Sequence, residues 1–175
     1  MSRAFLREST LEEEAVIPRP VSLLPRGVRN YMTAEGAERL RAELARLVGQ
    51  ERPALAALPG DDPEAKRQRQ MLDQRVDYLQ ESLRTAEIPA APPDASQVGF
   101  GATVTVRDSQ QNESTYRLVG VDETDPGQNW VSWQAPVAKA LWNARLGQRV
   151  PFKFPSGRTE LEIVQVSYAQ ARLAR

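Results

Sequence analysis

The stretch from residue 33 to residue 88 carries two apolar stripes separated by a Pro-Gly break, and this pattern restricts the fold more than any other feature. The stripe positions before and after the break are Leu40, Leu44, Leu47, Leu55 and Leu58, then Leu72, Val76, Leu79 and Leu83. Helical spacing of this kind places each set on one face of a helix. Because Pro59 and Gly60 do not favour the continuation of a helix, the sequence predicts two helices that pack as an antiparallel coiled hairpin.

Local signals define the first of these helices. Thr33 can cap free backbone N–H groups at its start, and Glu35 favours the positive end of the helix dipole. Pro53 lies inside the first stripe, where its missing N–H and its ring should bend or loosen the helix.

Acidic residues gather at the reversal between the two helices. Asp61, Asp62 and Glu64 follow the Pro-Gly break, so a long, thin hairpin carries their carboxylates away from the body of the protein. Acids at such a turn are ordinarily solvated and without a function. They are also the groups best suited to carry chemistry in a chain of this composition.

That composition excludes several classes of site. The 175 residues include 23 basic and 23 acidic residues, no Cys and no His. Balanced charge argues against non-specific binding to nucleic acid. Disulfides, thiolate nucleophiles, most zinc sites and His-based acid–base catalysis are excluded as well. No run of about 18 apolar residues predicts a membrane span, so we expect a soluble cytoplasmic protein.

The rest of the chain divides around the hairpin. Repeated prolines over residues 1–30 predict an extended, partly disordered arm. The proline-rich segment 89–97 predicts a linker. It separates a hairpin domain, residues 31–88, from a second domain, residues 98–175. The predicted elements of that domain are strands at 102–106, 115–121 and 129–133, a short helix at 137–141 led by Pro136, and a hairpin of 150–154 with 160–166 across 155–157. The fold class is therefore α+β.

Several of these segments resemble the Gre family of bacterial transcription elongation and transcript-cleavage factors, and its GreB branch more closely. The matching segments, in chain order, are Thr33-Ala34-Glu35-Gly36, Glu51-Arg52-Pro53, Gly60-Asp61-Asp62-Pro63-Glu64-Ala65, Arg75-Val76-Asp77-Tyr78-Leu79, Phe100-Gly101-Ala102, residues 118–123, residues 135–141 and Leu146-Gly147. The tip segment is similar to the family's G-D-x-x-E-N-A. The resemblance covers roughly residues 31 to 168 and implies an FKBP-like C-terminal domain.

The resemblance also implies a function and the residues that carry it. A Gre factor is an accessory protein rather than an enzyme: its hairpin enters the secondary channel of RNA polymerase, which then cleaves the nascent RNA of a backtracked complex. By match of motif, Asp61 and Glu64 are the tip acids that help to hold a Mg²⁺ shared with the polymerase active site. Lys66, Arg67 and Arg69 match a basic cluster that meets the RNA. Asp122, Glu123 and Pro136 are expected to face the polymerase. The factor is expected to bind it as a monomer.

This chain departs from the family pattern at the tip. Ala65 stands where the family has Asn, and Pro63 stands where it usually has Ser or Lys. Alignment on the outer motifs leaves each helix about six residues short, or roughly 9 Å at 1.5 Å per residue. A non-cleaving regulator that occupies the channel therefore stands beside the cleavage factor as an alternative. Two further alternatives are a prolyl isomerase in the second domain, with Phe152 and Phe154 in its strands, and a coiled-hairpin adaptor.

Overall fold

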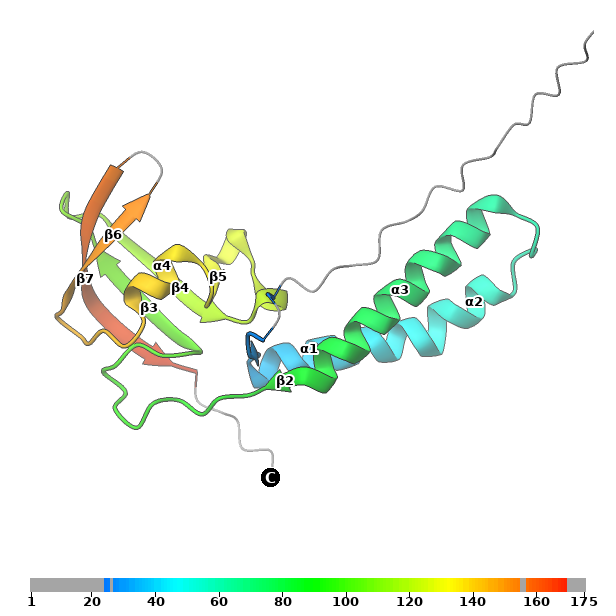
Figure 1. Ribbon diagram of the computed structural model, residues 1–175, viewed down its shortest axis with the longest axis horizontal. Coiled ribbons are helices and arrows are strands. Elements are labelled where there is room, and N and C mark those ends of the chain that lie inside the picture. Colours follow the sequence, from blue (N-terminus) through cyan, green and yellow to red (C-terminus); the bar gives the residue numbers. More distant parts are fainter. Residues whose placement is uncertain (1–23, 26, 155–156, 170–175) are drawn as a thin grey trace, which may run out of the picture.

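The structure consists of a pair of long helices beside a curled five-stranded sheet, arranged along the long axis of the molecule (Figure 1). The computed structural model describes residues 24–25, 27–154 and 157–169. Most of the arm predicted for residues 1–30 lies outside these residues, as do Pro155 and Ser156 of the predicted hairpin turn. The mixed α+β class is confirmed.

The first arm of the helix pair, residues 34–56, is helical throughout but not uniform. Its elements are α1 (Ala34–Arg46), the π-helical η1 (Leu47–Glu51) and α2 (Arg52–Ala56). The predicted N-cap is confirmed, because Thr33 Oγ1 accepts a hydrogen bond from the Gly36 N–H at 2.9 Å.

The π turn has its cause in Pro53. A proline inside a helix lacks the N–H that would bond the carbonyl four residues earlier, and its ring clashes with that carbonyl. Immediately before it, the Arg52 N–H bonds the Leu47 carbonyl, one residue further back than in an α-helix. The loosening predicted at Pro53 is thus realised as one wide turn, and the helix resumes after it.

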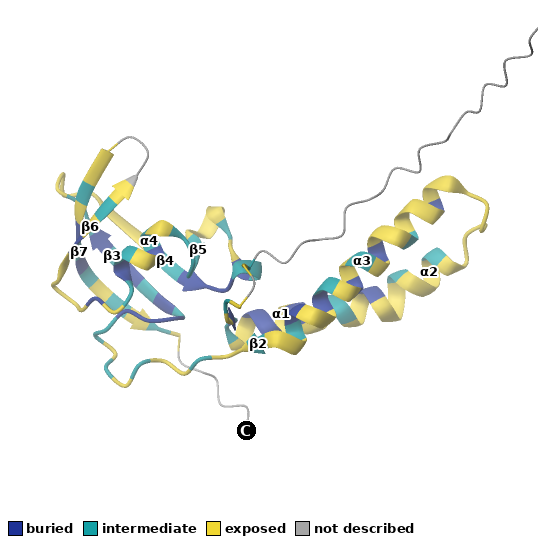
Figure 2. Cartoon of the chain, viewed as in Figure 1, coloured by how far each residue is buried: buried dark blue, intermediate teal, exposed yellow. Residues whose placement is uncertain are grey.

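The second arm is α3 (Pro63–Thr85), a helix of 23 residues. Between the arms lies an apolar core made by Met32, Ala37, Leu40, Leu47, Leu72, Val76 and Leu79. Figure 2 shows that most of the buried, dark blue segments of the helix pair lie in the half nearer the sheet. The prediction that Leu58 belongs to the stripe is wrong: α2 ends at Ala56, and Leu58 lies in the turn with 43% of its surface exposed.

A short strand pair, which the sequence pattern did not predict, closes the base of the helix pair. β1 (Asn30–Tyr31) runs parallel to β2 (Ala86–Glu87). The buried Asn30 side chain donates to the Ser82 carbonyl at 2.9 Å. The chain therefore enters and leaves the helix pair at one place.

The sheet has the strand order β5-β4-β3-β7-β6. The bounds of its strands are β3 (Ala102–Arg107), β4 (Glu113–Val119), β5 (Trp130–Ser132), β6 (Arg149–Phe154) and β7 (Gly157–Tyr168). All neighbours are antiparallel except β4 and β5, which are parallel. The predicted strands are confirmed, with small shifts at their ends.

One face of the sheet packs against α4 (Pro136–Leu141), the helix predicted after Pro136. The core there includes Val104, Leu118, Leu141 and Ile163, all fully buried. Phe152 packs against this core.

The predicted strand at 115–121 ends earlier than expected. β4 stops at Val119, and residues Val121–Glu123 form the short 3-10 helix η2. The chain turns there because the Glu123 carboxylate accepts from the Gly120 N–H at 2.9 Å. A second 3-10 turn, η3 (Pro126–Gln128), precedes β5.

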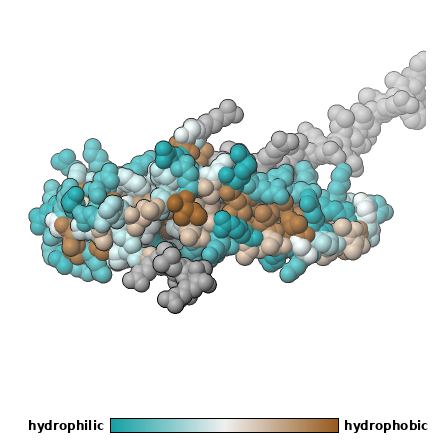
Figure 3. All heavy atoms as spheres, turned by 90° about the horizontal axis from the view of Figure 1, so that it is seen from below, coloured by the Kyte–Doolittle hydropathy of each residue, from teal (hydrophilic) through white to brown (hydrophobic). Residues whose placement is uncertain are grey.

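The helix pair leaves part of its apolar surface uncovered. Figure 3 shows hydrophobic residues along the pair, and Val48 and Met71 are 40% and 51% exposed. Two helices alone cannot cover both sides of their seam. Among the described residues, no helix is both long and apolar enough to cross a membrane.

The core of the helix pair can be tested with two Leu→Ala substitutions. Leu79 is fully buried, so Leu79→Ala should lower the free energy of unfolding by about 2–5 kcal/mol. Leu58 is exposed in the turn, so Leu58→Ala should change it by less than about 0.5 kcal/mol. Urea unfolding followed by circular dichroism measures both, and equal effects would contradict the assignment of the core.

Candidate functional site at the tip of the helix pair

The distal end of the helix pair is the tip turn, residues 57–62, in which every residue is exposed. Asp62 caps α3: its Oδ1 accepts from the Glu64 N–H at 3.0 Å, and Pro63 occupies the first helical turn. These are ordinary helix-start signals, and they fix where α3 begins. The reversal predicted at Pro59 and Gly60 is confirmed.

The structure brings the predicted acids Asp61 and Glu64 to this end on two different elements. Asp61 lies in the tip turn, whereas Glu64 lies in the first turn of α3, where the helix dipole favours a negative charge. Both are exposed, and Glu64 Oε1 accepts from Gln68 Nε2 at 3.1 Å. Two exposed acidic side chains therefore lie at the distal end of the helix pair.

Two carboxylates make an incomplete metal site. The described residues contain no group of three or more Asp, Glu, His or Cys side chains that could hold a metal ion. Mg²⁺ is often bound through one or two protein carboxylates, with its other ligands supplied by substrate and water. The tip acids fit the role of partial donors and do not form a site by themselves.

The three predicted basic residues divide into two kinds. Lys66 and Arg67 are exposed on α3. Arg69 is partly buried and turned toward the first arm: Nε donates to the Leu55 carbonyl at 2.9 Å, and Nη2 donates to the carbonyls of Leu58 and Pro59 at 2.7 and 3.2 Å. Arg69 therefore caps the end of α2, a role that the sequence pattern did not reveal.

Glu123, a predicted partner contact, lies instead at the junction of the helix pair and the sheet, with only 3% of its surface exposed. Its carboxylate accepts from the backbone N–H of Thr33 at 2.9 Å, from the Thr33 hydroxyl and from the Gly120 N–H. A Cβ at Gly36 would overlap this carboxylate. Gly36 thus leaves the space in which a buried anion reaches the positive end of α1.

Asp122 binds the other arm at the same junction. Its carboxylate accepts from the Tyr78 hydroxyl and from Ser82 Oγ at 2.7 Å, both on α3. Burial raises the pKa of the Tyr78 phenol, and the hydrogen bond to Asp122 raises it further. Adjacent carboxylates therefore join the two arms to the sheet, one arm each.

A cation–π contact reinforces the junction. The Arg117 guanidinium lies 4.5 Å from the centre of the Trp130 ring and donates to Glu35 in α1 at 2.8 Å. Arg39, also in α1, lies 5.2 Å from the same ring. Such contacts add to the hydrogen bonds of Asp122 and Glu123.

Pro136 is exposed at the start of α4. It lies on the sheet and apart from the tip acids, so the structure places the predicted site residues in three regions rather than one: the tip, the junction and the start of α4. Asp61, Glu64, Lys66, Arg67 and Pro136 are exposed, Arg69 and Asp122 are half-buried, and Glu123 is buried.

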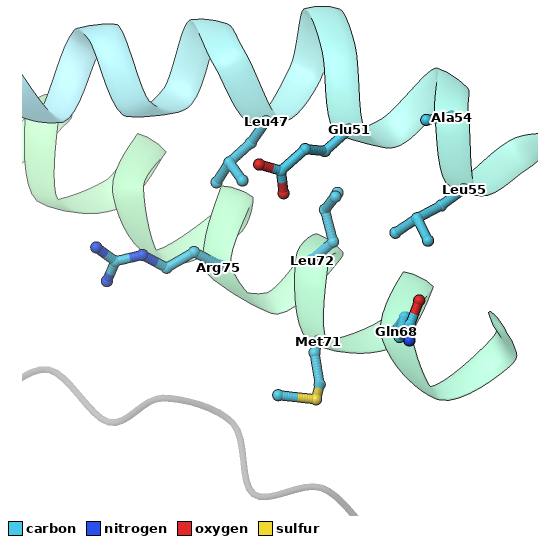
Figure 4. Close-up of a pocket in the computed structure, with 8 residues that line it drawn as sticks. All are labelled: Leu47, Glu51, Ala54, Leu55, Gln68, Met71, Leu72 and Arg75. Carbon is cyan, nitrogen blue, oxygen red and sulfur yellow. The ribbon is translucent and has the colours of Figure 1, made fainter. Parts of the chain in front are cut away.

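A groove of about 490 Å³ lies between the arms, next to the π turn. Figure 4 shows Leu47, Leu55 and Leu72 pointing into the space between the helices, with Met71 directed away from the first arm. The groove contains none of the tip acids. Its lining is mainly apolar, and it offers no catalytic arrangement.

A family model and sequence relatives point to the same family. A family model described as "Transcription elongation factor, GreA/GreB, C-term" matches residues 93–168. The transcription elongation factor GreB of Neisseria meningitidis is 38% identical to this chain over 154 residues, which cover 80% of this chain and 94% of the relative. The transcription elongation factor GreA of Alkalilimnicola ehrlichii is 38% identical over 153 residues, covering 79% and 97%.

Solved structures give a looser match. A structure of the transcription factor Gfh1 has a TM-score of 0.40 and 25% sequence identity, covering 79% of this chain and 97% of that chain. The elongation factor GreA/GreB from Nitrosomonas europaea has a TM-score of 0.41 and 23% identity, covering 81% and 99%.

The packing of the Glu123 carboxylate against Gly36 can be tested by adding a Cβ at position 36. Gly36→Ala should displace the buried carboxylate from its donors and destabilise the protein by at least about 2 kcal/mol. The matched control is Gly49→Ala in the π turn, where a Cβ meets nothing within 4 Å and should stabilise by about 0.5–1 kcal/mol. Denaturant unfolding compares them, and a neutral Gly36→Ala would contradict the packing described.

The Tyr78–Asp122 bond should give the protein an alkaline pH dependence. Because burial and the bond to Asp122 raise the pKa of Tyr78 in the folded protein above its ordinary value of about 10, the stability that this bond contributes is fully present below about pH 10 and is lost as pH rises through the folded-state pKa. Tyr78→Phe should therefore be less stable than wild type at neutral pH, with a difference that shrinks above pH 10. Thermal unfolding across pH measures this; a constant difference would contradict it.

Proposed function

This chain belongs to the GreA/GreB family of transcription elongation factors, and on that premise we propose that it binds RNA polymerase through the secondary channel and stimulates the polymerase's own transcript cleavage. In this proposal the protein is a cytoplasmic monomer. It acts as an accessory factor on backtracked complexes, and the polymerase performs the reaction on the nascent RNA.

The observation that carries the proposal is the display of Asp61 and Glu64 at the end of a narrow helix pair. The 23 residues of α3 extend about 35 Å at 1.5 Å per residue. Of the residues that the structure describes, only the two helices and the turn occupy this distal part (Figure 1). A support of this shape suits entry into a channel that excludes the sheet.

The proposal includes the finer identity of both parts. The leucine-rich seam between antiparallel arms, with Leu40 and Leu79 buried in it, supports a coiled-coil hairpin. The curled, mainly antiparallel sheet packed against the single helix α4 supports an FKBP-like domain.

Each tip residue then has a distinct task. Asp61 and Glu64 would hold a Mg²⁺ shared with the polymerase active site. A second metal of this kind supplies an activated water and offsets the charge that develops in phosphodiester cleavage. Lys66 and Arg67, exposed just behind the acids, attract the phosphates of the displaced RNA end.

The sheet provides the second contact with polymerase. Pro136 is exposed on α4 and is available to the rim of the channel. Asp122 and Glu123 act differently, because their carboxylates are engaged with Thr33, Tyr78 and Ser82. They influence the contact by holding the helix pair in a fixed direction relative to the sheet.

A second candidate function, channel binding without cleavage, is favoured by the reach of the tip. The 154 aligned positions shared with the Neisseria relative cover 80% of this chain, or about 140 residues, so roughly 14 positions have no counterpart here. If these residues are missing from the two helices, the tip acids lie several ångströms further from the polymerase active site. Because Mg²⁺–oxygen bonds are only about 2.1 Å long, the acids would then not reach the metal. Such a factor would block the channel and slow nucleotide addition.

The deciding experiment measures RNA 3′-end cleavage by a backtracked polymerase. Wild type should stimulate cleavage, and Asp61→Asn/Glu64→Gln should reduce the stimulation at least about tenfold, a loss of about 1.4 kcal/mol in transition-state stabilisation. The cause would be the loss of two metal-binding carboxylates without a change in side-chain size.

The matched control is Glu38→Gln/Asp77→Asn, which neutralises one Glu and one Asp that are exposed elsewhere on the helix pair. It should stimulate cleavage as wild type does. Binding without stimulation, together with slowed nucleotide addition by wild type, would reject the cleavage factor in favour of the channel blocker. No binding to polymerase would reject both.

A further inference from the structure

The two tip acids keep a fixed spacing only if the tip turn is held against α3. Asp61 lies in the turn and Glu64 lies in the helix, so any movement of the turn changes the distance between their carboxylates. Metal ligation and catalysis are sensitive to misplacement of about 1 Å. What fixes the turn therefore decides whether the acids act together.

The turn has few backbone hydrogen bonds of its own. Pro59 and Pro63 bring no N–H, and no backbone–backbone bond of Pro59, Gly60 or Asp61 occurs within the described part of the chain. The last carbonyls of a helix have no partner inside that helix, and those at the end of α2 extend into this turn. The Asp62 cap holds only the side next to α3.

Arg69 adds bonds from the other arm, to the Leu58 and Pro59 carbonyls and to the Leu55 carbonyl, which also accepts from the Leu58 N–H at 3.3 Å. From α3, its guanidinium reaches across the pair to the carbonyls of Leu55, Leu58 and Pro59, at 2.9, 2.7 and 3.2 Å. A planar guanidinium presents donors in a fixed geometry and can bond several acceptors at once, whereas a lysine ammonium is a compact charge on a flexible stem. A cation at the end of α2 also complements the helix dipole.

From these contacts we infer that Arg69 is a positioning residue, which fixes the tip turn on α3 and with it the spacing of Asp61 and Glu64. The inference rests on the proposed function for its consequence, and it separates Arg69 from Lys66 and Arg67. The latter two remain on the exposed face of α3, where they meet RNA. Arg69 has its donors committed to the protein's own backbone.

The first test uses the free protein and ¹⁵N relaxation of the tip amides. In wild type, the order parameters of Gly60 and Asp61 should be close to the value of about 0.85 for rigid backbone, and in Arg69→Lys they should fall below about 0.6. Arg67→Gln is the control: it removes a neighbouring charge but no bond to the turn, and should leave them unchanged. Unchanged order parameters in Arg69→Lys would overturn the inference.

The second test separates positioning from attraction of RNA in the cleavage assay. Arg69→Lys keeps the charge, so its half-saturating concentration for polymerase should match wild type, while the maximal cleavage rate falls about tenfold. Arg41→Gln, which removes an exposed charge on α1 away from the tip, is the control for this assay and should keep the wild-type maximal rate. A wild-type maximal rate in Arg69→Lys would overturn the inference, whereas a wild-type protein that stimulates no cleavage would overturn the proposed cleavage function and leave the relaxation test to decide on Arg69.

Discussion

The arrangement of the molecule depends on one buried carboxylate. Glu123 extends from the sheet to the beginning of α1, where the free N–H of Thr33 and the positive end of the helix dipole receive it. A buried charge is costly unless every part of it is bonded. The sequence meets this demand with a glycine at position 36 and another at 120, both of which leave room for the carboxylate. The direction of the helix pair follows from this contact.

Periodicity and turn chemistry predicted most of the secondary structure, because both are local. The Thr33 cap, the break at Pro59 and the helix after Pro136 were all visible in the sequence. The burial of Glu123 was not, since it depends on a residue 90 positions away. The parallel pairing of β1 with β2 was missed for the same reason, and each strand is too short to show a pattern.

The sequence predicted which residues lie at the candidate site, but it predicted the role of only some of them. The acids and their exposure followed from the Pro-Gly turn. Lys66, Arg67 and Arg69 formed one cluster in the sequence, yet the structure divides them, because α3 directs Arg69 toward the end of α2. Sequence spacing gives the face of a helix. It does not indicate whether the facing element ends there with carbonyls in need of donors.

The π turn has a consequence for how the length of this arm can vary. Leu47 and Leu55 are eight residues apart, which in a regular α-helix of 3.6 residues per turn would rotate Leu55 about 80° away from α3. The wide turn absorbs roughly one residue, so that both leucines lie against Leu72 (Figure 4). Deletion of a single residue here would convert the wide turn into a regular α-helical turn and leave the two leucines seven residues apart, so the tip would not rotate. Changes of arm length between related genes need not occur in whole heptads.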